Sequence, residues 1–271
     1  MPGKIMYPFR LLSTGFNDCF SNMGLDEALL ESVAGCLPGG GYDGQPILRF
    51  YGWNPPAISI GYFQNLADEV DIQAAKQYGF DLVRRISGGG TVLHRSELTY
   101  SIIIGLDHPL AGKDLDDSYR ILCQGLIQGL GFLGIESVFS GTNDILSGGK
   151  KISGNAQTRR MNCLLQHGTI LLDNDAEIMF EVLKVPKEKN KGKLISEIKE
   201  RLGSLRSILG CKIDFDEAES VFTRGFADAL GLLLNKSEIS IAEKKRAVEL
   251  AEAKYKTSTW LGACRTCSIL R

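Results

Sequence analysis

The first clear pattern of apolar and polar positions has helical spacing. The segment 21–35 (SNMGLDEALLESVAG) carries an apolar residue every three or four positions, which predicts a helix with one apolar face. Ser21 or Asn22 can cap its start, and Gly35 stands near its end.

Short blocks rich in β-branched and aromatic residues follow, and each is typical of a strand. We expect strands over 46–53, 57–63, 80–86, 91–94 and 97–104, with a short helix over 68–79. A longer amphipathic helix is predicted over 114–134, followed by a strand-rich block over 135–173 with hairpin turns at Gly148-Gly149 and near Arg160. From Asp175 onward the pattern predicts helices only, over 174–185, 192–210, 214–234 and 239–257. Strands in one cluster with helices at the ends indicate an α+β fold, with mixed or antiparallel sheets flanked by helices.

The composition of the chain argues against several classes of function. The chain has 271 residues, a formal net charge of -1 and a pI of about 6.3, so a nucleic acid is a poor candidate partner. The N-terminus lacks the pattern of a signal peptide, and no run is long enough to span a membrane. Seven cysteines at scattered positions are typical of reduced thiols in a cytoplasmic protein. Cys264 and Cys267 form a single C-x-x-C, which fits a tail without function better than a metal or redox site.

A run of three glycines, Gly88 to Gly90, stands between two strand-like blocks. No Walker phosphate loop and no dinucleotide fingerprint opening a helix is present. A hairpin turn needs only two residues, and glycine also permits close approach of a ligand. Arg84 and Arg85 precede the run and offer guanidinium donors for a carboxylate or phosphate. Local sequence leaves both the turn and the ligand site open.

The segment 141–160 holds a second candidate site. Lys151 can neutralise an oxyanion or phosphate, and the small residues Gly154 and Ala156 leave room on one face of the strand. A hairpin with a charged turn explains the same residues. His94 and His167 lie in apolar strands, where a buried structural histidine is the commoner case. The lysine-rich run 184–193 is typical of a solvated loop, or of a basic loop that meets an acidic partner.

Three segments, RRISGGGTVLH, NDILSGGKKISGNAQ and QHGTILL, occur in this order, and together they resemble the lipoate–protein ligase and octanoyltransferase family. The resemblance runs from about Leu11 to Trp260 and implies the catalytic fold shared with biotin ligases. It implies a catalytic domain over 1–260, helical from about 175, and a tail over 261–271. A C-terminal accessory domain like that of the larger ligases is not expected, so a separate accessory protein is one option.

By resemblance, Lys151 is the catalytic lysine, and Asp144 is a candidate Mg²⁺ ligand. The residues implied to bind the substrate and acyl-adenylate are Arg84, Arg85, Ser87, Gly88, Gly89, Gly90, Thr91, Val92, His94, Asn143, Asp144, Gly154, Ala156, His167 and Gly168.

The resemblance implies an ATP-dependent ligase that activates lipoate or octanoate as the acyl-AMP with ATP and Mg²⁺. The acyl group then passes to a lysine of an acceptor lipoyl domain, in an E2 subunit, a glycine-cleavage H protein or a lipoate-binding protein. Positioning and charge neutralisation suit that chemistry. The first alternative is an octanoyltransferase or lipoyl amidotransferase with a cysteine nucleophile. Family members place that cysteine before the lysine strand, where 137–150 has none; Cys163 lies on the next strand. The second alternative is an acyl-binding module without catalysis.

Overall fold

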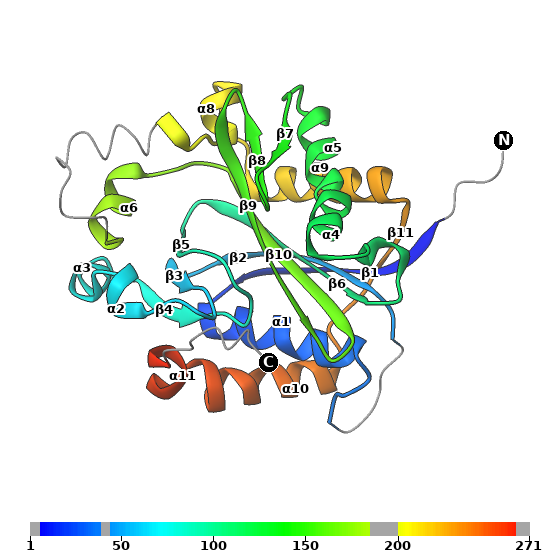
Figure 1. The fold of residues 1–271 in the computed structure, drawn as a ribbon, viewed down its shortest axis with the longest axis horizontal. Helices are drawn as coiled ribbons and strands as arrows, with labels where there is room; N and C mark the ends of the chain where they lie inside the picture. Colours follow the sequence, from blue (N-terminus) through cyan, green and yellow to red (C-terminus); the bar gives the residue numbers. More distant parts are fainter. Residues whose placement is uncertain (1–5, 39–43, 185–199, 264–271) are drawn as a thin grey trace.

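The computed structural model describes residues 6–38, 44–184 and 200–263. Its centre is an eight-stranded mixed sheet in the order β11-β1-β2-β6-β10-β9-β8-β7, beside a three-stranded sheet in the order β4-β3-β5 (Figure 1). The α+β class is therefore confirmed. Among these residues no helix is long and apolar enough to cross a membrane. Of the lysine-rich run, all but Lys184 lies outside the described part.

The strands of the large sheet are β1 (Tyr7–Asn17), β2 (Ile47–Trp53), β6 (Glu97–Gly105), β7 (Val138–Ser140), β8 (Asp144–Ser147), β9 (Lys150–Arg160), β10 (Cys163–Leu171) and β11 (Leu232–Lys236). Both predicted hairpins are confirmed, since β8 and β9 pair across Gly148-Gly149 and Arg160 pairs with Cys163 at the β9–β10 turn. The prediction of helices alone after Asp175 is wrong. The chain forms β11 there, which pairs in parallel with β1 at one edge of the sheet.

The small sheet is built from β3 (Ala57–Ile60), β4 (Asp81–Arg84) and β5 (Val92–His94). β3 pairs in parallel with β4 and antiparallel with β5. The segment that joins β4 to β5 is the triple-glycine loop, so the glycines connect two strands of this sheet, as the apolar blocks around them predicted. The short helices α2 (Leu66–Glu69) and α3 (Ile72–Gln77) replace the single helix expected over 68–79.

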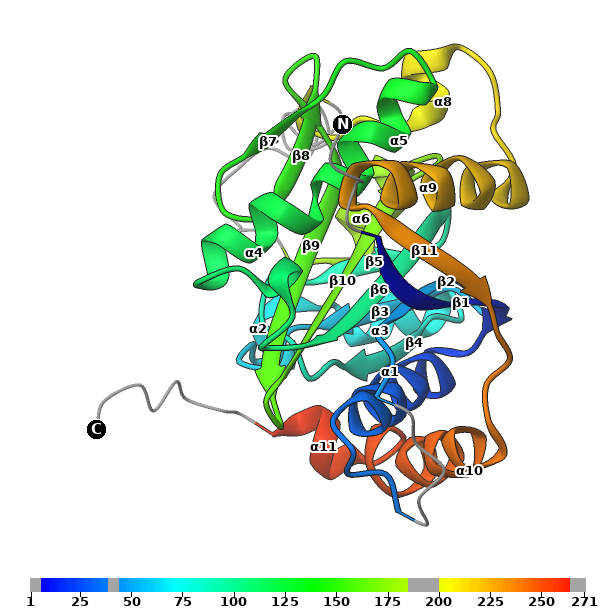
Figure 2. The ribbon, with the colours of Figure 1, turned by 90° about the vertical axis from the view of Figure 1, so that its right-hand side faces the viewer.

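Helices cover both faces of the large sheet (Figure 2). α1 (Cys19–Val33), α10 (Ile241–Leu250), the π-helical turn η2 (Ala251–Tyr255) and α11 (Ser258–Gly262) lie on one side. Asp18, rather than Ser21 or Asn22, caps α1, because its carboxylate accepts hydrogen bonds from the backbone N–H groups of Phe20 and Ser21. The described parts of the chain also include α6 (Ala176–Val182), α8 (Leu205–Leu209) and the 3₁₀ turn η1 (Pro109–Ala111).

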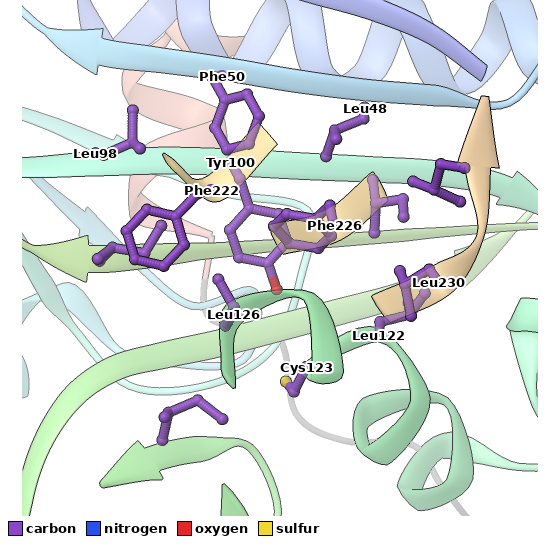
Figure 3. Close-up of a cluster of buried hydrophobic side chains, with 14 of the residues drawn as sticks. Leu48, Phe50, Leu98, Tyr100, Leu122, Cys123, Leu126, Phe222, Phe226 and Leu230 are labelled. Carbon is purple, nitrogen blue, oxygen red and sulfur yellow. The ribbon is translucent and has the colours of Figure 1, made fainter. Parts of the chain in front are cut away.

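The opposite face carries α4 (Leu115–Leu122), α5 (Gln124–Phe132) and α9 (Phe215–Leu230), so the helix predicted over 114–134 is two helices. Phe222 and Phe226 of α9 pack with Tyr100 of β6 in an apolar core that also buries Cys123 (Figure 3). Burying side chains of this size contributes about 1.5–3 kcal/mol each. The sheet between the two helical layers positions the site described next.

Candidate active site

A cavity of about 190 Å³ lies where the large and small sheets meet. Buried side chains, among them Met23, Tyr51 and Trp53, form part of its wall. Gly89 and Gly90 of the triple-glycine loop also line it and are exposed to solvent. The cavity is therefore apolar and buried on one side and open to solvent beside the loop.

Lys151 stands at the open side of the cavity. Its Nζ lies 2.8 Å from Asp144 Oδ1, and both side chains are about one-third exposed. The pair is an ionic contact rather than a directed hydrogen bond. A second groove of about 570 Å³ shares Lys151, Gly90 and Thr91 with the cavity and is also lined by Asp144. The ammonium group is thus accessible from both spaces.

The space above Gly154 is taken by the side chain of Lys151. A Cβ at Gly154 would lie 2.7 Å from Cε and 2.8 Å from Nζ of Lys151. Because Gly154 has no side chain, the Lys151 side chain can lie over this part of β9. Asn143 and Asn155 are joined to each other by backbone and side-chain hydrogen bonds, and both line the cavity.

The two adjacent arginines separate, as alternation along a strand requires. Arg85 lines the cavity. Arg84 is fully buried and donates to the carbonyl oxygens of Gly61, Gln64 and Leu261. Arg84 thus ties the small sheet to α11 and does not line the cavity.

Both predicted histidines line the cavity, and both have two hydrogen-bond partners. His94 Nδ1 contacts Glu97 Oε1 at 2.7 Å, and its ring stacks on Trp53 at 3.8 Å between centroids. His167 Nδ1 lies 3.0 Å from Asp26 Oδ2. Burial lowers the pKa of His94, and the hydrogen bond to Glu97 offsets only part of that effect.

The structure brings most of the predicted site residues together. Those that line the cavity are Arg85, Gly89, Gly90, Thr91, Val92, His94, Asn143, Lys151, Gly154, Ala156, His167 and Gly168. Four others do not line it. Arg84 is buried beside α11, Asp144 lines the adjoining groove, and Ser87 and Gly88 accept hydrogen bonds from Arg85.

Sequence reasoning missed Asp26, Arg49 and Ser59. Asp26 is a buried carboxylate that accepts hydrogen bonds from Arg49, Tyr51, Ser101 and His167. Burial alone would raise its pKa, but Arg49 and His167 outweigh burial, so the pKa lies below its usual value. Charged residues inside an apolar helix and an apolar strand were the signal available, because such residues are rarely buried without partners.

The structure gives no support to the predicted Mg²⁺ site. Asp144 is in contact with Lys151, and among residues 6–38, 44–184 and 200–263 no three His, Cys, Asp or Glu side chains gather around a common point. Mg²⁺ is usually held by one or two carboxylates together with waters and substrate phosphates, and the one candidate carboxylate, Asp144, contacts a cation instead.

None of the cysteines in the described residues lines the cavity. Cys163 is buried on β10, and burial raises the pKa of its thiol. Cys123 lies in the core on the α5 side, where burial raises its pKa to about 12. Since the thiolate is the nucleophilic form, both positions disfavour it.

Comparison with known proteins places this site in a family. Residues 18–227 match the model of the lipoyl protein ligase A/B catalytic domain. The chain belongs to this family. It is an enzyme of the lipoate ligase and octanoyltransferase group, as the three sequence segments predicted.

A curated relative, octanoyltransferase LipM from Geobacillus kaustophilus, is 35% identical over 93% of this chain and 97% of its own length. Among solved structures, a bipartite lipoate protein ligase from Thermoplasma acidophilum aligns with a TM-score of 0.83 at 29% identity, covering 98% of this chain and all of the other. Lipoate-protein ligase A bound with ATP aligns with a TM-score of 0.79 at 28% identity, over 96% of this chain and all of the other. The fold is thus that of the lipoate ligases.

The prediction of an ATP-dependent ligase is wrong on this comparison. Full-length relatives of higher identity than the solved ligases are named octanoyltransferases. The expectation of ATP and Mg²⁺ as cofactors followed from that prediction and loses its basis with it. Asn143 and Asp144, which the resemblance implied for binding the acyl-adenylate, here make hydrogen bonds to Asn155 and a contact with Lys151, respectively.

Proposed function

We propose that this chain is an octanoyltransferase that moves an octanoyl group from a carrier-protein thioester to a lysine of an acceptor lipoyl domain. The observation that carries the proposal is an apolar cavity that opens at the Lys151 ammonium group. A medium-length saturated chain fits such a wall, and its carbonyl would then lie beside a cation. The relatives named octanoyltransferase support the same assignment.

The net reaction needs no added energy source. The ε-amine of the acceptor lysine replaces the carrier thiol at the octanoyl carbonyl, so that an amide bond forms and the thioester bond breaks. The proton that the amine loses leaves with the thiol. Attack on the carbonyl produces an oxyanion, and a positioned cation stabilises that charge. Lys151 is the candidate for this role, and the adjoining groove gives both protein substrates access to it.

The acceptor follows from the same chemistry. The family acts on lipoyl-domain proteins, and we propose such a domain as the partner, presenting its lysine at the open side of the cavity. E2 subunits and glycine-cleavage H proteins are the two acceptors to compare.

The test is intact-mass analysis of an unmodified lipoyl domain incubated with the enzyme and octanoyl carrier protein, without nucleotide. The proposal predicts an octanoyl adduct on the target lysine that Lys151→Ala removes. An acceptor whose target lysine is replaced by methionine is the control and should stay unmodified. A domain left unmodified by the wild-type enzyme would contradict the proposal.

A further inference from the structure

The Arg85 guanidinium is a buried cation whose hydrogen bonds all go to neutral acceptors. The residue is 5% exposed. Nε donates to Ser87 Oγ at 3.1 Å, one terminal nitrogen donates to Ser59, and the other donates to the carbonyl oxygens of Gly88 and Gly90 at 2.7 Å each. Burying a charge without a compensating partner costs several kcal/mol, so something further must stabilise it.

Two chains of hydrogen bonds connect this cation to buried carboxylates. In the first, Ser87 Oγ lies 2.6 Å from His167 Nε2, and His167 Nδ1 lies 3.0 Å from Asp26 Oδ2. The second chain has the same order of residue types. Ser59 Oγ lies 2.8 Å from His94 Nε2, and His94 Nδ1 lies 2.7 Å from Glu97 Oε1. Each chain runs from Arg85 through a serine and a histidine to an acid.

The partners determine which way each hydrogen bond points. A carboxylate only accepts, so Nδ1 of each histidine carries a hydrogen. The arginine only donates, so each serine oxygen accepts from Arg85 and its own hydrogen is free to point to Nε2. In this arrangement Nε2 of each ring accepts from the serine, and the ring hydrogen is on Nδ1. Charge-assisted bonds at both ends polarise the chain and strengthen it.

Neither serine is placed as a nucleophile, although each stands in a Ser–His–acid order. Ser87 is fully buried and does not line the cavity. Ser59 lines the cavity but is only 1% exposed, and its oxygen contacts both Arg85 and His94.

The hydrogen bonds from Arg85 to the triple-glycine loop determine which backbone groups of the loop face the cavity. In a trans peptide the C=O and the following N–H point in opposite directions. Since Arg85 holds the carbonyls of Gly88 and Gly90, the N–H groups of Gly89 and Thr91 point away from it. Among the described residues neither has a hydrogen-bond acceptor, and both residues line the cavity. Gly89 has φ of +90°, which an L residue rarely adopts.

We propose that Ser59, Ser87, His94 and His167 are positioning residues. Their two chains hold the Arg85 guanidinium, and through it they hold the triple-glycine loop with the Gly89 and Thr91 N–H groups presented to the substrate carbonyl. Two aligned backbone donors and Lys151 would together form the site for the oxyanion. The kinetic part of this proposal rests on the proposed octanoyl transfer; the structural part does not.

The structural part is tested by ¹⁵N NMR of the full chain at neutral pH. Both buried histidines should be neutral with the hydrogen on Nδ1, and the Arg85 Nε–H signal should be slowly exchanging. Ser87→Ala should broaden or shift that signal, whereas Ser118→Ala should leave it unchanged. Ser118 is an equally buried serine that hydrogen-bonds Gln157 outside both chains. A hydrogen on Nε2, or a charged ring, would overturn the proposal whether or not the enzyme transfers octanoate.

The kinetic part compares kcat and KM of the same variants with octanoyl carrier protein. Losing one hydrogen bond to a charged group predicts a fall of about tenfold in kcat for Ser59→Ala and for Ser87→Ala. The double variant should lose less than the product of the two, since both chains act on one guanidinium. Ser59→Thr, which keeps the hydroxyl, should recover most of the rate. Equal rates in all variants, or an octanoyl ester on either serine, would overturn the positioning role.

Discussion

The side chain of Lys151 occupies the space that a side chain on Gly154 would need. A Cβ at position 154 would lie 2.7 Å from Lys151 Cε and 2.8 Å from its Nζ. The two residues lie on the same strand, three positions apart, and the absence of a side chain on one sets the place of the other. The proposed oxyanion cation is therefore positioned by a glycine.

Gly154→Ala should lower the activity and leave the stability nearly unchanged. The atoms displaced are the free end of a flexible side chain, so the free energy of unfolding should change by less than about 1 kcal/mol. The ammonium group would move from its place, and we expect kcat to fall at least about tenfold by loss of orientation. Gly131→Ala, on a helix with open space around the Cβ, is the control and should keep full activity. Unchanged kcat in Gly154→Ala would count against a fixed position for Lys151.

Replacing Lys151 itself tests its charge. Lys151→Ala should lower kcat by about 10²- to 10³-fold, the usual effect of losing one oxyanion-stabilising group. Stability should change little, since partly exposed ion pairs contribute about 0–1 kcal/mol. Asp144→Asn removes the partner but keeps the ammonium group, and it should retain far more activity than Lys151→Ala. Equal losses in the two variants would indicate that the pair has only a structural role.

The fold class, both hairpins and about half of the residues that line the cavity were predictable from sequence, whereas β1 and the edge strand β11 were not. β11 follows α9 directly, so its leucines extend a helical pattern, and β1 contains Pro8 and Gly15. Their parallel pairing joins Tyr7 to Leu232. No local pattern encodes a contact between residues so far apart.

The two Ser–His–acid chains escaped prediction for the same reason. Asp26 lies on α1 and His167 on β10, which are 141 positions apart in the chain. The sequence marks each as a polar residue in an apolar element, but only the fold shows that they meet. Arg84 shows the converse: it stands beside Arg85 in sequence, but it donates to Gly61, Gln64 and Leu261 and does not line the cavity.

Cys163→Ala should leave octanoyl transfer within about twofold of wild type. Burial raises the pKa of this thiol, and the residue lies outside the cavity lining, so the thiolate is neither formed nor placed for attack. The initial rate of Cys163→Ala is compared with that of the double variant Cys264→Ser with Cys267→Ser. These two positions lie outside the described residues. A loss of about 10²-fold or more in Cys163→Ala would contradict this placement.

Acid should destabilise the protein through His94. Its folded-state pKa is below its ordinary value, so the unfolded chain binds the proton more readily. Stability conferred by the neutral ring is therefore complete above about pH 6.5 and declines as pH falls below it. Urea unfolding at pH 7.5 and pH 5.5 should show the decline in wild type and a smaller one in His94→Gln. The carboxylates with lowered pKa, such as Glu243 at about 2, lose their contribution only at more acidic pH. An equal decline in both proteins would rule out His94 as its source.

Removing Asp26 should lower the free energy of unfolding by a large amount. Asp26→Ala leaves the buried Arg49 guanidinium without its carboxylate, which costs about 3–5 kcal/mol. Asp228→Ala on the surface should change the free energy of unfolding by less than about 0.5 kcal/mol. Chemical denaturation of the two variants measures the difference, and similar values for both would show that the buried pair is not a main source of stability.

The most direct measurement is a comparison of acyl donors. The purified enzyme and an unmodified lipoyl domain are given either octanoyl carrier protein without nucleotide or free octanoate with ATP and Mg²⁺, and the initial rate of lysine octanoylation is measured for each. Octanoyl transfer predicts rapid modification from the thioester, dependence on Lys151, and little from the free acid. Modification from the free acid with ATP, and none from the thioester, would contradict the account.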